Sequence, residues 1–333
     1  MKRSRWGLVA ILCVIIFSVC WFFFHERILE KKEESIAQTE KKIKAVEEKP
    51  QEAKPETKEE KQQEAPLTKV VPQIPEPIVE AKAAVVLDAG DGKVIYKNNE
   101  TEPLAPASMS KMMTAYIVLE NIHKGKIHWE DQVKISAKSS QTDGAGIPVQ
   151  MGDVLTVKDL YHALMIQSAN NSAVALAEHL APTEKDFVEL MNQKAKQLEL
   201  SDGTIFANAS GLQEADGTET KMPAADVAQL AYHLVKDYPE ILQVSHLSQS
   251  QLAFKNTTVT NTNKMLNQAN QELYIEGMDG LKTGFTDSAG YCFTGTAMQG
   301  DRRLITVVMG TDSKEKRFTE THKLLSYGFQ IVK

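Results

Sequence analysis

Ser108 and Lys111 are the residues whose types and spacing most directly suggest covalent chemistry. A serine hydroxyl is a poor nucleophile at neutral pH and needs a base beside it. A lysine amine can be that base when burial lowers its pKa. Residues three apart share a helix face, so we expect the two side chains to stand together where a helix begins. Ser108 could instead be a simple helix N-cap, and a second S-x-x-K at 313–316 shows that the pattern also arises by chance.

A second polar group, Ser168 and Asn170, interrupts two apolar stretches that are typical of helices. A hydroxyl and an amide at such a break can point into a cleft and act on a bound molecule. The competing interpretation is a helix break in which both side chains only satisfy neighbouring backbone groups. The pattern at this position does not decide between the two.

A third group, Lys282, Thr283 and Gly284, lies near the C-terminus, where we expect it to open a strand. A cation and a hydroxyl at a strand edge can bind a substrate carboxylate. Gly284 has no side chain, so a ligand can approach its backbone closely. The alternative is a surface lysine that precedes a turn.

The three groups occur in the order S-x-x-K, S-x-N and K-T-G, which is the motif order of penicillin-binding proteins and class A β-lactamases. All three in this order are far less expected by chance than any one of them. From about residue 81 onward the sequence resembles the serine-type D-alanyl-D-alanine carboxypeptidases, the low-molecular-weight penicillin-binding proteins of peptidase family S11. The matching text includes PASMSKMMTAYIVLE, QSANNSAVALAEHLA and GLKTGFTDSAGYCFTGTA.

The resemblance implies a covalent acyl-enzyme mechanism. Ser108 is expected to be the acylated nucleophile, and Lys111 is expected to accept its proton. Ser168 is the expected proton relay, and Asn170 is the expected contact to a substrate amide. Lys111 must be neutral in the resting enzyme, and we expect burial and the nearby Lys282 to lower its pKa.

The resemblance also implies which residues bind the substrate. Lys282 and Thr283 are expected to bind its terminal carboxylate with help from Arg317, whose alternative role is a surface charge on the last helix. The backbone N–H groups of Ser108 and Phe285 are expected to form an oxyanion hole.

The implied function is that of a DD-carboxypeptidase, which removes the terminal D-alanine from peptidoglycan stem pentapeptides. The implied partners are a stem peptide ending in D-Ala-D-Ala and β-lactam antibiotics, which would inhibit covalently. A β-lactamase, a DD-transpeptidase and a non-catalytic cell-wall binding protein are the alternatives. A class A β-lactamase needs an E-x-x-L-N segment. The most similar segment of this sequence, residues 189–192, has the wrong spacing between its glutamate and asparagine. A relic binding protein would usually lack a reacting group, and all are present.

The chain also departs from the family pattern at several positions. Ala169 replaces a glycine inside S-G-N, and Asn171 replaces the aspartate that usually follows. Residues 144–153 differ from the usual text of an active-site loop, and Met222-Pro223 stands where a Ser-Thr pair is frequent. None of these changes removes a reacting group, but the loop detail cannot be carried over from the family.

The elements that must position these groups are strands at both ends of the globular region and helices between them. Residues 81–99 predict a hairpin, and 290–299 and 303–310 predict two more strands. Helices are predicted at 104–120, with one inward-facing side, and at 156–180, 185–198, 224–235 and 316–327. The pattern predicts an α+β fold whose two ends share one sheet. The resemblance implies the penicillin-binding protein/β-lactamase-like form, an antiparallel sheet with flanking helices plus an all-helical subdomain.

The composition of the chain also bears on which partners and cofactors to expect. The chain has 333 residues, 42% of them hydrophobic, and a net charge of −6. No basic patch with interleaved aromatic residues suggests a nucleic-acid partner. Cys13, Cys20 and Cys292 predict neither a disulfide framework nor a metal cluster, and HExxH and CxxC are both missing. We therefore expect no metal and no cofactor.

Residues 1–24 predict a membrane anchor. Residues 7–24 carry no charge, which is near the lower limit for a transmembrane helix. The basic residues before them predict a single pass through the cell membrane, with a cytoplasmic N-terminus and an extracytoplasmic catalytic domain. A cleaved signal peptide is the alternative, but bulky residues at 21–24 replace the small ones of a cleavage site.

Residues 25–80 are of a different composition, with 14 glutamates, 11 lysines or arginines and several prolines. Such a stretch cannot bury enough apolar surface to fold. It predicts a charged linker that holds the catalytic domain, residues 81–333, away from the membrane.

Overall fold

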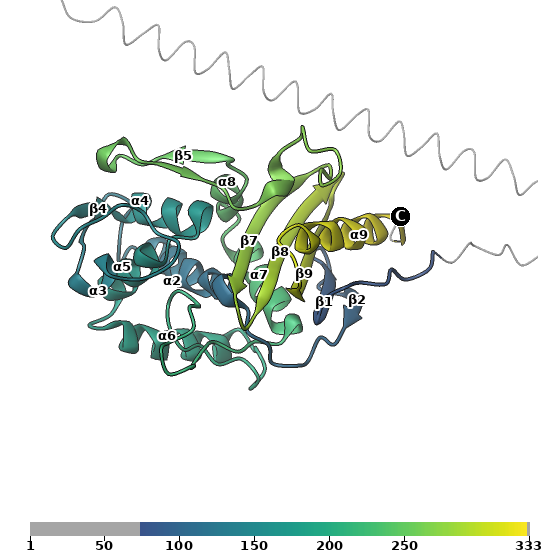
Figure 1. Cartoon of the computed structure of the whole chain (residues 1–333), viewed down its shortest axis with the longest axis horizontal. Coiled ribbons are helices and arrows are strands. Elements are labelled where there is room, and N and C mark those ends of the chain that lie inside the picture. Colours follow the sequence, from purple (N-terminus) through teal and green to yellow (C-terminus); the bar gives the residue numbers. More distant parts are fainter. Residues whose placement is uncertain (1–73, 332–333) are drawn as a thin grey trace, which may run out of the picture. The chain divides into compact units, whose positions relative to one another are not determined.

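The structure, a computed structural model, describes residues 74–331 (Figure 1). The predicted membrane anchor, 1–24, and the linker as far as residue 73 lie outside the described residues. The last seven residues of the predicted linker, 74–80, have no regular secondary structure. Within 74–331, no helix combines the length and the apolar character that crossing a membrane requires.

Five antiparallel strands form the main sheet, in the order β2-β1-β9-β8-β7. The strands are β1 (Ala83–Asp88), β2 (Val94–Asn98), β7 (Met278–Thr286), β8 (Gly290–Gln299) and β9 (Arg302–Thr311). The central strand β9 pairs with β1, which lies more than 200 residues earlier in the chain. The prediction that the two ends of the globular region share one sheet is therefore confirmed, and so is the α+β class.

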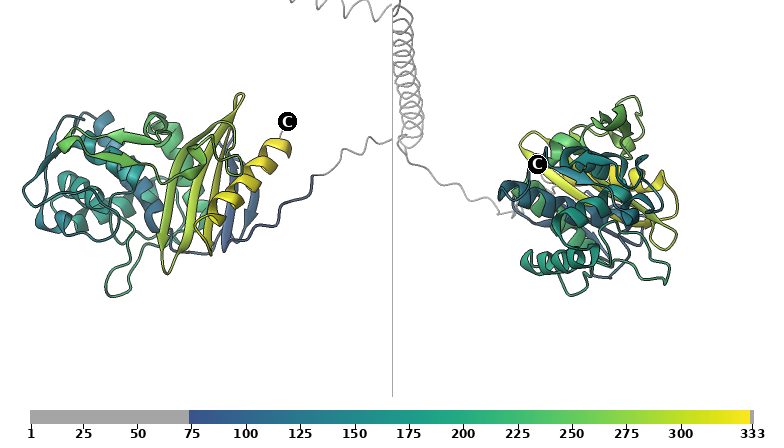
Figure 2. Two further views of the ribbon diagram at one scale, coloured as in Figure 1. Left: turned by 45° about the horizontal axis from the view of Figure 1, so that its top comes forward. Right: turned by 90° about the vertical axis from the view of Figure 1, so that its left-hand side faces the viewer.

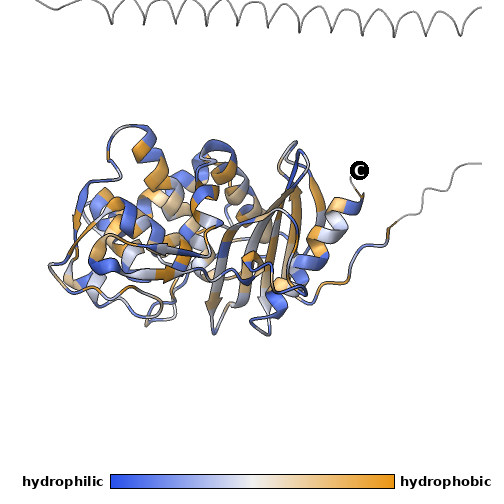
Figure 3. Cartoon of the chain, turned by 90° about the horizontal axis from the view of Figure 1, so that it is seen from above, coloured by the Kyte–Doolittle hydropathy of each residue, from blue (hydrophilic) through white to orange (hydrophobic). Residues whose placement is uncertain are grey.

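Helices cover both faces of this sheet (Figures 1 and 2). Helix α9 (Lys316–Ile331) packs on one face, and α7 (Ala224–Asp237) packs on the other. Side chains alternate between faces along a strand, so Val86 belongs to the apolar cluster under α9 while Val85 belongs to the cluster on the α7 side. Burial on both faces explains why the first five residues of β1, 83–87, are all apolar rather than alternating with polar ones. Figure 3 shows hydrophobic colours in the strands of the sheet.

The rest of the described chain forms a helical part beside the edge strand β7 (Figure 1). Two pairs of short strands flank its helices, β3 with β4 and β5 with β6. The elements are α2 (Lys111–His123), β3 (Gln132–Lys134), α3 (Ala137–Ser140), β4 (Val154–Thr156), α4 (Val157–His162), α5 (Asn170–Leu180), α6 (Glu184–Gln197), α8 (Ile241–Ser245), β5 (Gln249–Gln251) and β6 (Thr258–Thr260). Short 3₁₀ helices are η1 (Ala107–Ser110), η3 (Phe254–Asn256) and η4 (Lys264–Leu266).

Helix α2 is more deeply buried than its apolar spacing predicts. We expected one inward face, but all residues from Lys111 to Leu119 are buried. The helix contacts α5, α6 and α7, so it runs through the centre of the helical part. A helix surrounded by others needs no polar face, and a prediction of one buried face fails for that reason.

The predicted helix at 156–180 is two helices joined by an irregular segment. Helix α4 ends at His162 and continues as one π-helical turn, η2 (Ala163–Gln167). The helical conformation is interrupted at residues 168–169, and α5 begins at Asn170. The break itself was predicted from S-x-N, but the π turn was not, and such turns often occur at functional sites.

Candidate active site

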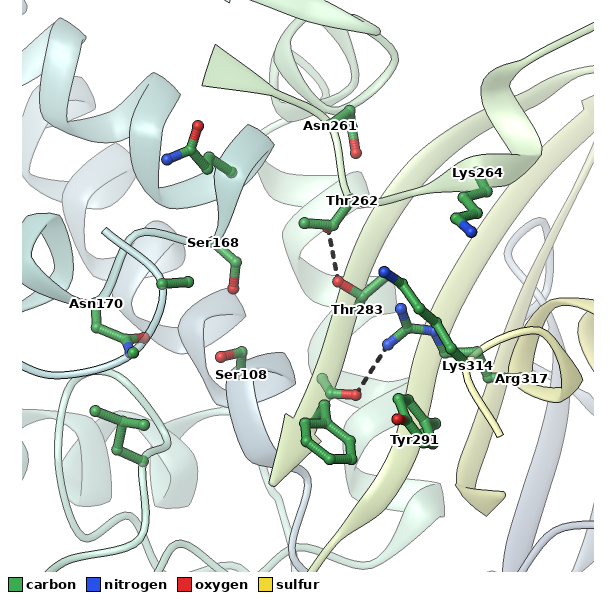
Figure 4. Close-up of a pocket in the computed structure, with 16 residues that line it drawn as sticks. Ser108, Ser168, Asn170, Asn261, Thr262, Lys264, Thr283, Tyr291, Lys314 and Arg317 are labelled. Carbon is green, nitrogen blue, oxygen red and sulfur yellow. Dashed lines mark hydrogen bonds between the residues drawn. The ribbon is translucent and has the colours of Figure 1, made fainter. Parts of the chain in front are cut away.

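A pocket of about 620 Å³ opens between the edge strand β7 and the helical part (Figure 4). It gathers most of the predicted site residues, which come from four separate segments of the chain. Those that line it are Ser108, Ser168, Asn170, Thr283, Gly284, Phe285 and Arg317. The other two, Lys111 and Lys282, are buried at 0% and 1% exposure. They lie out of solvent, in contact with the two serines of the pocket.

Ser108 lies in the 3₁₀ helix η1, one residue after a strained backbone position. Ala107 has φ +49°, in the left-handed region that a residue with a Cβ rarely adopts. Its carbonyl accepts a hydrogen bond from the Ser110 hydroxyl at 2.8 Å. Side chains at i and i+3 eclipse one another in a 3₁₀ helix, which aligns Ser108 with Lys111, the first residue of α2. We expected the start of a single α-helix, and this tighter turn brings the pair together more directly.

Lys111 Nζ has three oxygen neighbours, and only one of them can give a proton. It lies 2.8 Å from Ser108 Oγ. It donates to Asn170 Oδ1 and to the carbonyl oxygen of Ser210, both at 2.6 Å. The Asn170 amide is oriented by its other atom, because Nδ2 donates to the Asp143 carbonyl at 2.7 Å.

Burial holds the pKa of Lys111 well below its ordinary value, and the nearby charge of Lys282 lowers it further. Both causes match the expectation drawn from the sequence, with burial the larger. The lowered pKa therefore favours the neutral form of the amine. A neutral amine has two N–H donors and one lone pair, and its two acceptor partners use the donors. The lone pair is left to face the Ser108 hydroxyl.

Ser168 ends the π turn in a left-handed conformation, with φ +65°. Serine pays a steric cost there, so the conformation is held by its surroundings, as is common at active sites. Its Oγ accepts a hydrogen bond from Lys282 Nζ at 2.7 Å. Figure 4 shows the Ser168 side chain pointing toward Ser108. A hydroxyl held between a lysine and the nucleophile can pass a proton between them.

Lys282 does not open a strand as we predicted, because it lies in the middle of β7. Nor does its ammonium line the pocket, although we expected it to bind a carboxylate directly. Besides Ser168, Lys282 Nζ donates to the Thr283 carbonyl at 3.1 Å. Burial lowers its pKa to about 7, and the charge of Arg317 adds to this effect.

Thr283 does line the pocket, and its hydroxyl shares a 2.7 Å hydrogen bond with that of Thr262 (Figure 4). Thr262 belongs to a segment between β6 and η4 that also brings Asn261 and Lys264 to the pocket. We did not predict these three residues. The signal available was a polar run, N-T-N-K, some twenty residues before K-T-G, and only the folded chain shows which way it faces.

Gly284 serves a different contact from the one expected. We predicted that a ligand would approach its backbone, and Gly284 does line the pocket. A Cβ at this position, however, would lie 2.5 Å from the Pro106 carbonyl oxygen. The glycine therefore lets the turn that carries Ser108 pack against β7.

Arg317 lies in the first turn of α9 and is only 4% exposed, so it is not a surface charge. Its Nη1 donates to the Gly284 carbonyl at 3.1 Å. The guanidinium carbon lies 5.6 Å from the centre of the Tyr291 ring, and that ring stacks on Phe285 at 4.3 Å. Phe285 itself is 46% exposed in the pocket wall. The oxyanion-hole role of the Ser108 and Phe285 N–H groups stays a prediction.

Two departures from the family pattern have a structural account. Asn171 pairs with one residue of the divergent loop: its Oδ1 accepts from the Ile147 N–H at 3.2 Å, and its Nδ2 donates to the Ile147 carbonyl at 2.8 Å. Only an amide can both accept and donate in this way. The loop also presents Gly144 and Ala145 to the pocket, and the Ala145 carbonyl accepts from the Asn170 N–H at 2.6 Å.

Comparison with known proteins agrees with this geometry. The model of the D-alanyl-D-alanine carboxypeptidase family, peptidase S11, matches residues 69–313. The chain is 37% identical over 253 residues to D-alanyl-D-alanine carboxypeptidase DacF of Bacillus subtilis, covering 75% of this chain and 62% of that protein. It is 34% identical over 261 residues to DacC of Escherichia coli, covering 77% and 62% respectively. The chain thus spans about three fifths of the length of these relatives.

Solved structures show the same architecture. Penicillin-binding protein D2 from Listeria monocytogenes, crystallised with bound ampicillin, superposes with a TM-score of 0.67 at 34% identity. The match covers 77% of this chain and the whole of that one. Penicillin-binding protein 5 from Haemophilus influenzae gives a TM-score of 0.71 at 31% identity, over 77% of this chain and 73% of that one. The fold is therefore of the penicillin-binding protein type, as the resemblance implied.

Proposed function

Because the chain belongs to the peptidase S11 family of D-alanyl-D-alanine carboxypeptidases, we propose that it is a serine DD-carboxypeptidase. Its substrates are peptidoglycan stem pentapeptides, from which it removes the terminal D-alanine. β-Lactams acylate the same serine. The observation that carries the proposal is the buried Lys111 amine, whose pKa is lowered and whose Nζ lies 2.8 Å from Ser108 Oγ.

Acylation begins with a proton transfer that this geometry favours. Lys111 accepts the proton of Ser108 as Oγ attacks the carbonyl carbon of the penultimate D-alanine. The Asn170 and Ser210 oxygens then stabilise the ammonium, because both already accept hydrogen bonds from Nζ. The negative charge on the attacked carbonyl oxygen is taken up by backbone N–H donors beside Ser108.

The tetrahedral intermediate collapses when the terminal D-alanine leaves as an amine, which needs a proton. Ser168 donates its proton to the departing nitrogen and recovers one from Lys282, with which it shares a hydrogen bond. The leaving residue carries a carboxylate, and the Thr283 hydroxyl and Arg317 lie at the end of the pocket where this group is bound. Lys282 acts behind them, as proton donor and positive charge.

Deacylation completes the cycle. The proton that Lys111 took from Ser108 first passes through the Ser168 hydroxyl to Lys282 and replaces the one that Lys282 gave up. Water then takes the place of the departed D-alanine and attacks the acyl carbon while the neutral Lys111 accepts its proton. Ser108 leaves as an alkoxide and regains a proton from Lys111. No carboxylate is found among the residues that line the pocket, and Glu189 is exposed on α6. A glutamate-activated water of the class A β-lactamase type therefore has no counterpart at this site.

The test is incubation of the detergent-solubilised full chain with a labelled penicillin, read by intact mass, beside Ser108→Ala. We expect a stable adduct in the wild type and none in the variant. Rapid penicillin hydrolysis without an adduct would identify a β-lactamase instead. If no adduct forms and no D-alanine is released from a pentapeptide, the protein is a non-catalytic cell-wall binding protein.

We also propose that residues 1–24 anchor the protein in the cell membrane, with the catalytic domain outside. The support is the uncharged stretch 7–24 and the basic residues that precede it. Deleting residues 1–24 should move the protein from the membrane pellet to the soluble fraction. If N-terminal sequencing shows that the mature protein starts beyond residue 24, the proposal of an anchor is contradicted.

A further inference from the structure

The charged side chains that line the active-site pocket are all of one sign. Three cationic side chains line it, and no aspartate or glutamate does. These cations are Lys264, Lys314 and Arg317. They come from two segments, one following β6 and one leading into α9. Figure 4 shows them at the end of the pocket where Thr283 lies, away from Ser168 and Asn170.

The two lysines are not neutralised by the acidic residues nearby. Lys264 Nζ lies 3.3 Å from Glu315 Oε1, but both side chains are largely in solvent, where such a pair contributes little. Asp312 and Glu80 are both paired with Lys316. Lys314 lines the pocket and has no hydrogen bond or ion pair to any of the described residues, although its charge also acts on the Glu315 carboxylate.

Arg317 shows that this end of the pocket has unused capacity for an anion. Burial lowers its pKa to about 10, which leaves it cationic at neutral pH. One of its buried nitrogens, Nε, has no partner among the described residues. A buried polar atom without a partner is costly, and an anion bound in the pocket would lower that cost. Thr283 and Arg317 are enough to bind one carboxylate, so the two lysines need a further explanation.

We propose that Lys264 and Lys314 are specificity-determining residues, which make the enzyme select substrates that end in a free carboxylate. The inference rests on the proposed carboxypeptidase function and assigns these two residues a part in it. Their positive potential attracts a chain that ends at the leaving D-alanine. It gives no advantage to a chain whose terminus is amidated, and it repels one that continues with a cationic residue.

The potential should act mainly on association. Like charges that line a cleft raise the local concentration of an oppositely charged substrate, and salt screens the effect over about 10 Å at 0.1 M. The contribution of the two lysines should therefore appear in kcat/KM at low salt and fade as salt is added. The serine chemistry behind the pocket should not change.

The experiment uses the full chain in detergent and an acylated tripeptide ending in D-Ala-D-Ala, as the free acid and as the C-terminal amide. Cleavage is followed by mass spectrometry at 20 and 300 mM salt. For Lys264→Gln/Lys314→Gln we expect kcat/KM for the acid to fall about fivefold or more at low salt, and that for the amide to change by less than about twofold. Lys134→Gln, an exposed lysine on β3, is the matched control and should match the wild type.

Lys314→Glu sharpens the test, because reversing the charge should reduce cleavage of the acid further than removing it. The inference is overturned if the double variant keeps the wild-type rate on the acid and the wild-type salt dependence. It is also overturned if acid and amide fall by the same factor, which is what general damage to the pocket would cause. Failure of the carboxypeptidase proposal would look different: the wild type would cleave neither peptide and form no Ser108 adduct with penicillin.

Discussion

The two faces of the five-stranded sheet are both covered, but by different kinds of contact. Under α9 the buried side chains are mainly apolar, including Leu304 and Leu324, and Phe293 meets Phe318 edge to face at 5.1 Å. The helix also buries Glu320 and Thr321. On the opposite side, where β7 meets η1, two lysines are buried with serine and asparagine partners. The first face is mainly apolar, whereas the second is built around polar groups that contact one another.

The two faces therefore contribute to different properties: the α9 face contributes mainly to stability, and the opposite face carries the catalytic groups. Burying apolar surface contributes about 25 cal/mol per Å², whereas burying an ammonium costs free energy unless the group loses its charge. The left-handed residues Ala107 and Ser168 both lie on the costly side, beside the reacting groups. The α9 face therefore stabilises a sheet whose other face carries the strain and the lowered pKa values that catalysis needs.

The largest expected effect is on the catalytic side. Lys111→Met keeps the length of the side chain but removes the proton acceptor. Acylation by penicillin should slow by about 10²–10⁴-fold, while the free energy of unfolding changes by less than about 2 kcal/mol because no buried amine remains to be desolvated. Intact mass and urea denaturation measure the two quantities. Unimpaired acylation would remove Lys111 from the mechanism.

The converse experiment is Leu324→Ala on the α9 face. Removing a fully buried leucine should lower the free energy of unfolding by about 2–5 kcal/mol. The acylation rate of the folded fraction should stay close to that of the wild type, because Leu324 lies two helical turns beyond Arg317. A loss of acylation without a loss of stability would show that the two faces are not separate in this way.

The pH dependence of stability should also differ between the faces. The pKa of Lys282 is about 7 in the folded chain and about 10.4 when unfolded. Between these values the unfolded chain binds more protons, so stability should increase as the pH rises from 7 to 9. Urea denaturation at pH 7, 8 and 9 should show this increase in the wild type and a smaller one in Lys282→Met. Identical slopes in both proteins, with Lys134→Gln as control, would contradict the assignment.

The smallest effect concerns the strained turn. Ala107→Gly relieves a positive φ and should raise the free energy of unfolding by about 0.5–1 kcal/mol. Glu199→Gly relieves a φ of +56° far from the pocket and should stabilise to a similar extent. Only the first should slow acylation, about two- to threefold, because a looser turn positions Ser108 less accurately. Equal acylation rates in the two variants would show that the strain has no catalytic role.

The sequence was most informative where chemistry depends on local spacing. Ser108 and Lys111 are three residues apart, so any helical turn brings them together, and the hairpin and last strands follow from apolar runs between turn signals. The position of Lys282 near Lys111 was also predictable, because the resemblance places the K-T-G and S-x-x-K motifs in the same active site.

Contacts that depend on how distant segments pack were not predictable in the same way. Nothing in the spacing of Lys282 shows that it lies behind Ser168 rather than in the pocket. Thr262 and Lys264 reach the site because β6 packs on η2 and η4 packs on β7. The pairing of Asn171 with Ile147 depends on the path of a loop that departs from the family text.

The pairing of β1 with β9 also constrains when the protein can fold. A two-stranded hairpin is marginal in isolation, so β1 and β2 stay incomplete until β9, more than 200 residues later, is available. Residues 302–311 are made after the whole helical part, and contacts so distant in sequence form slowly. The sheet that carries β7 therefore closes only after the ribosome has made the more than 200 residues that separate β1 from β9.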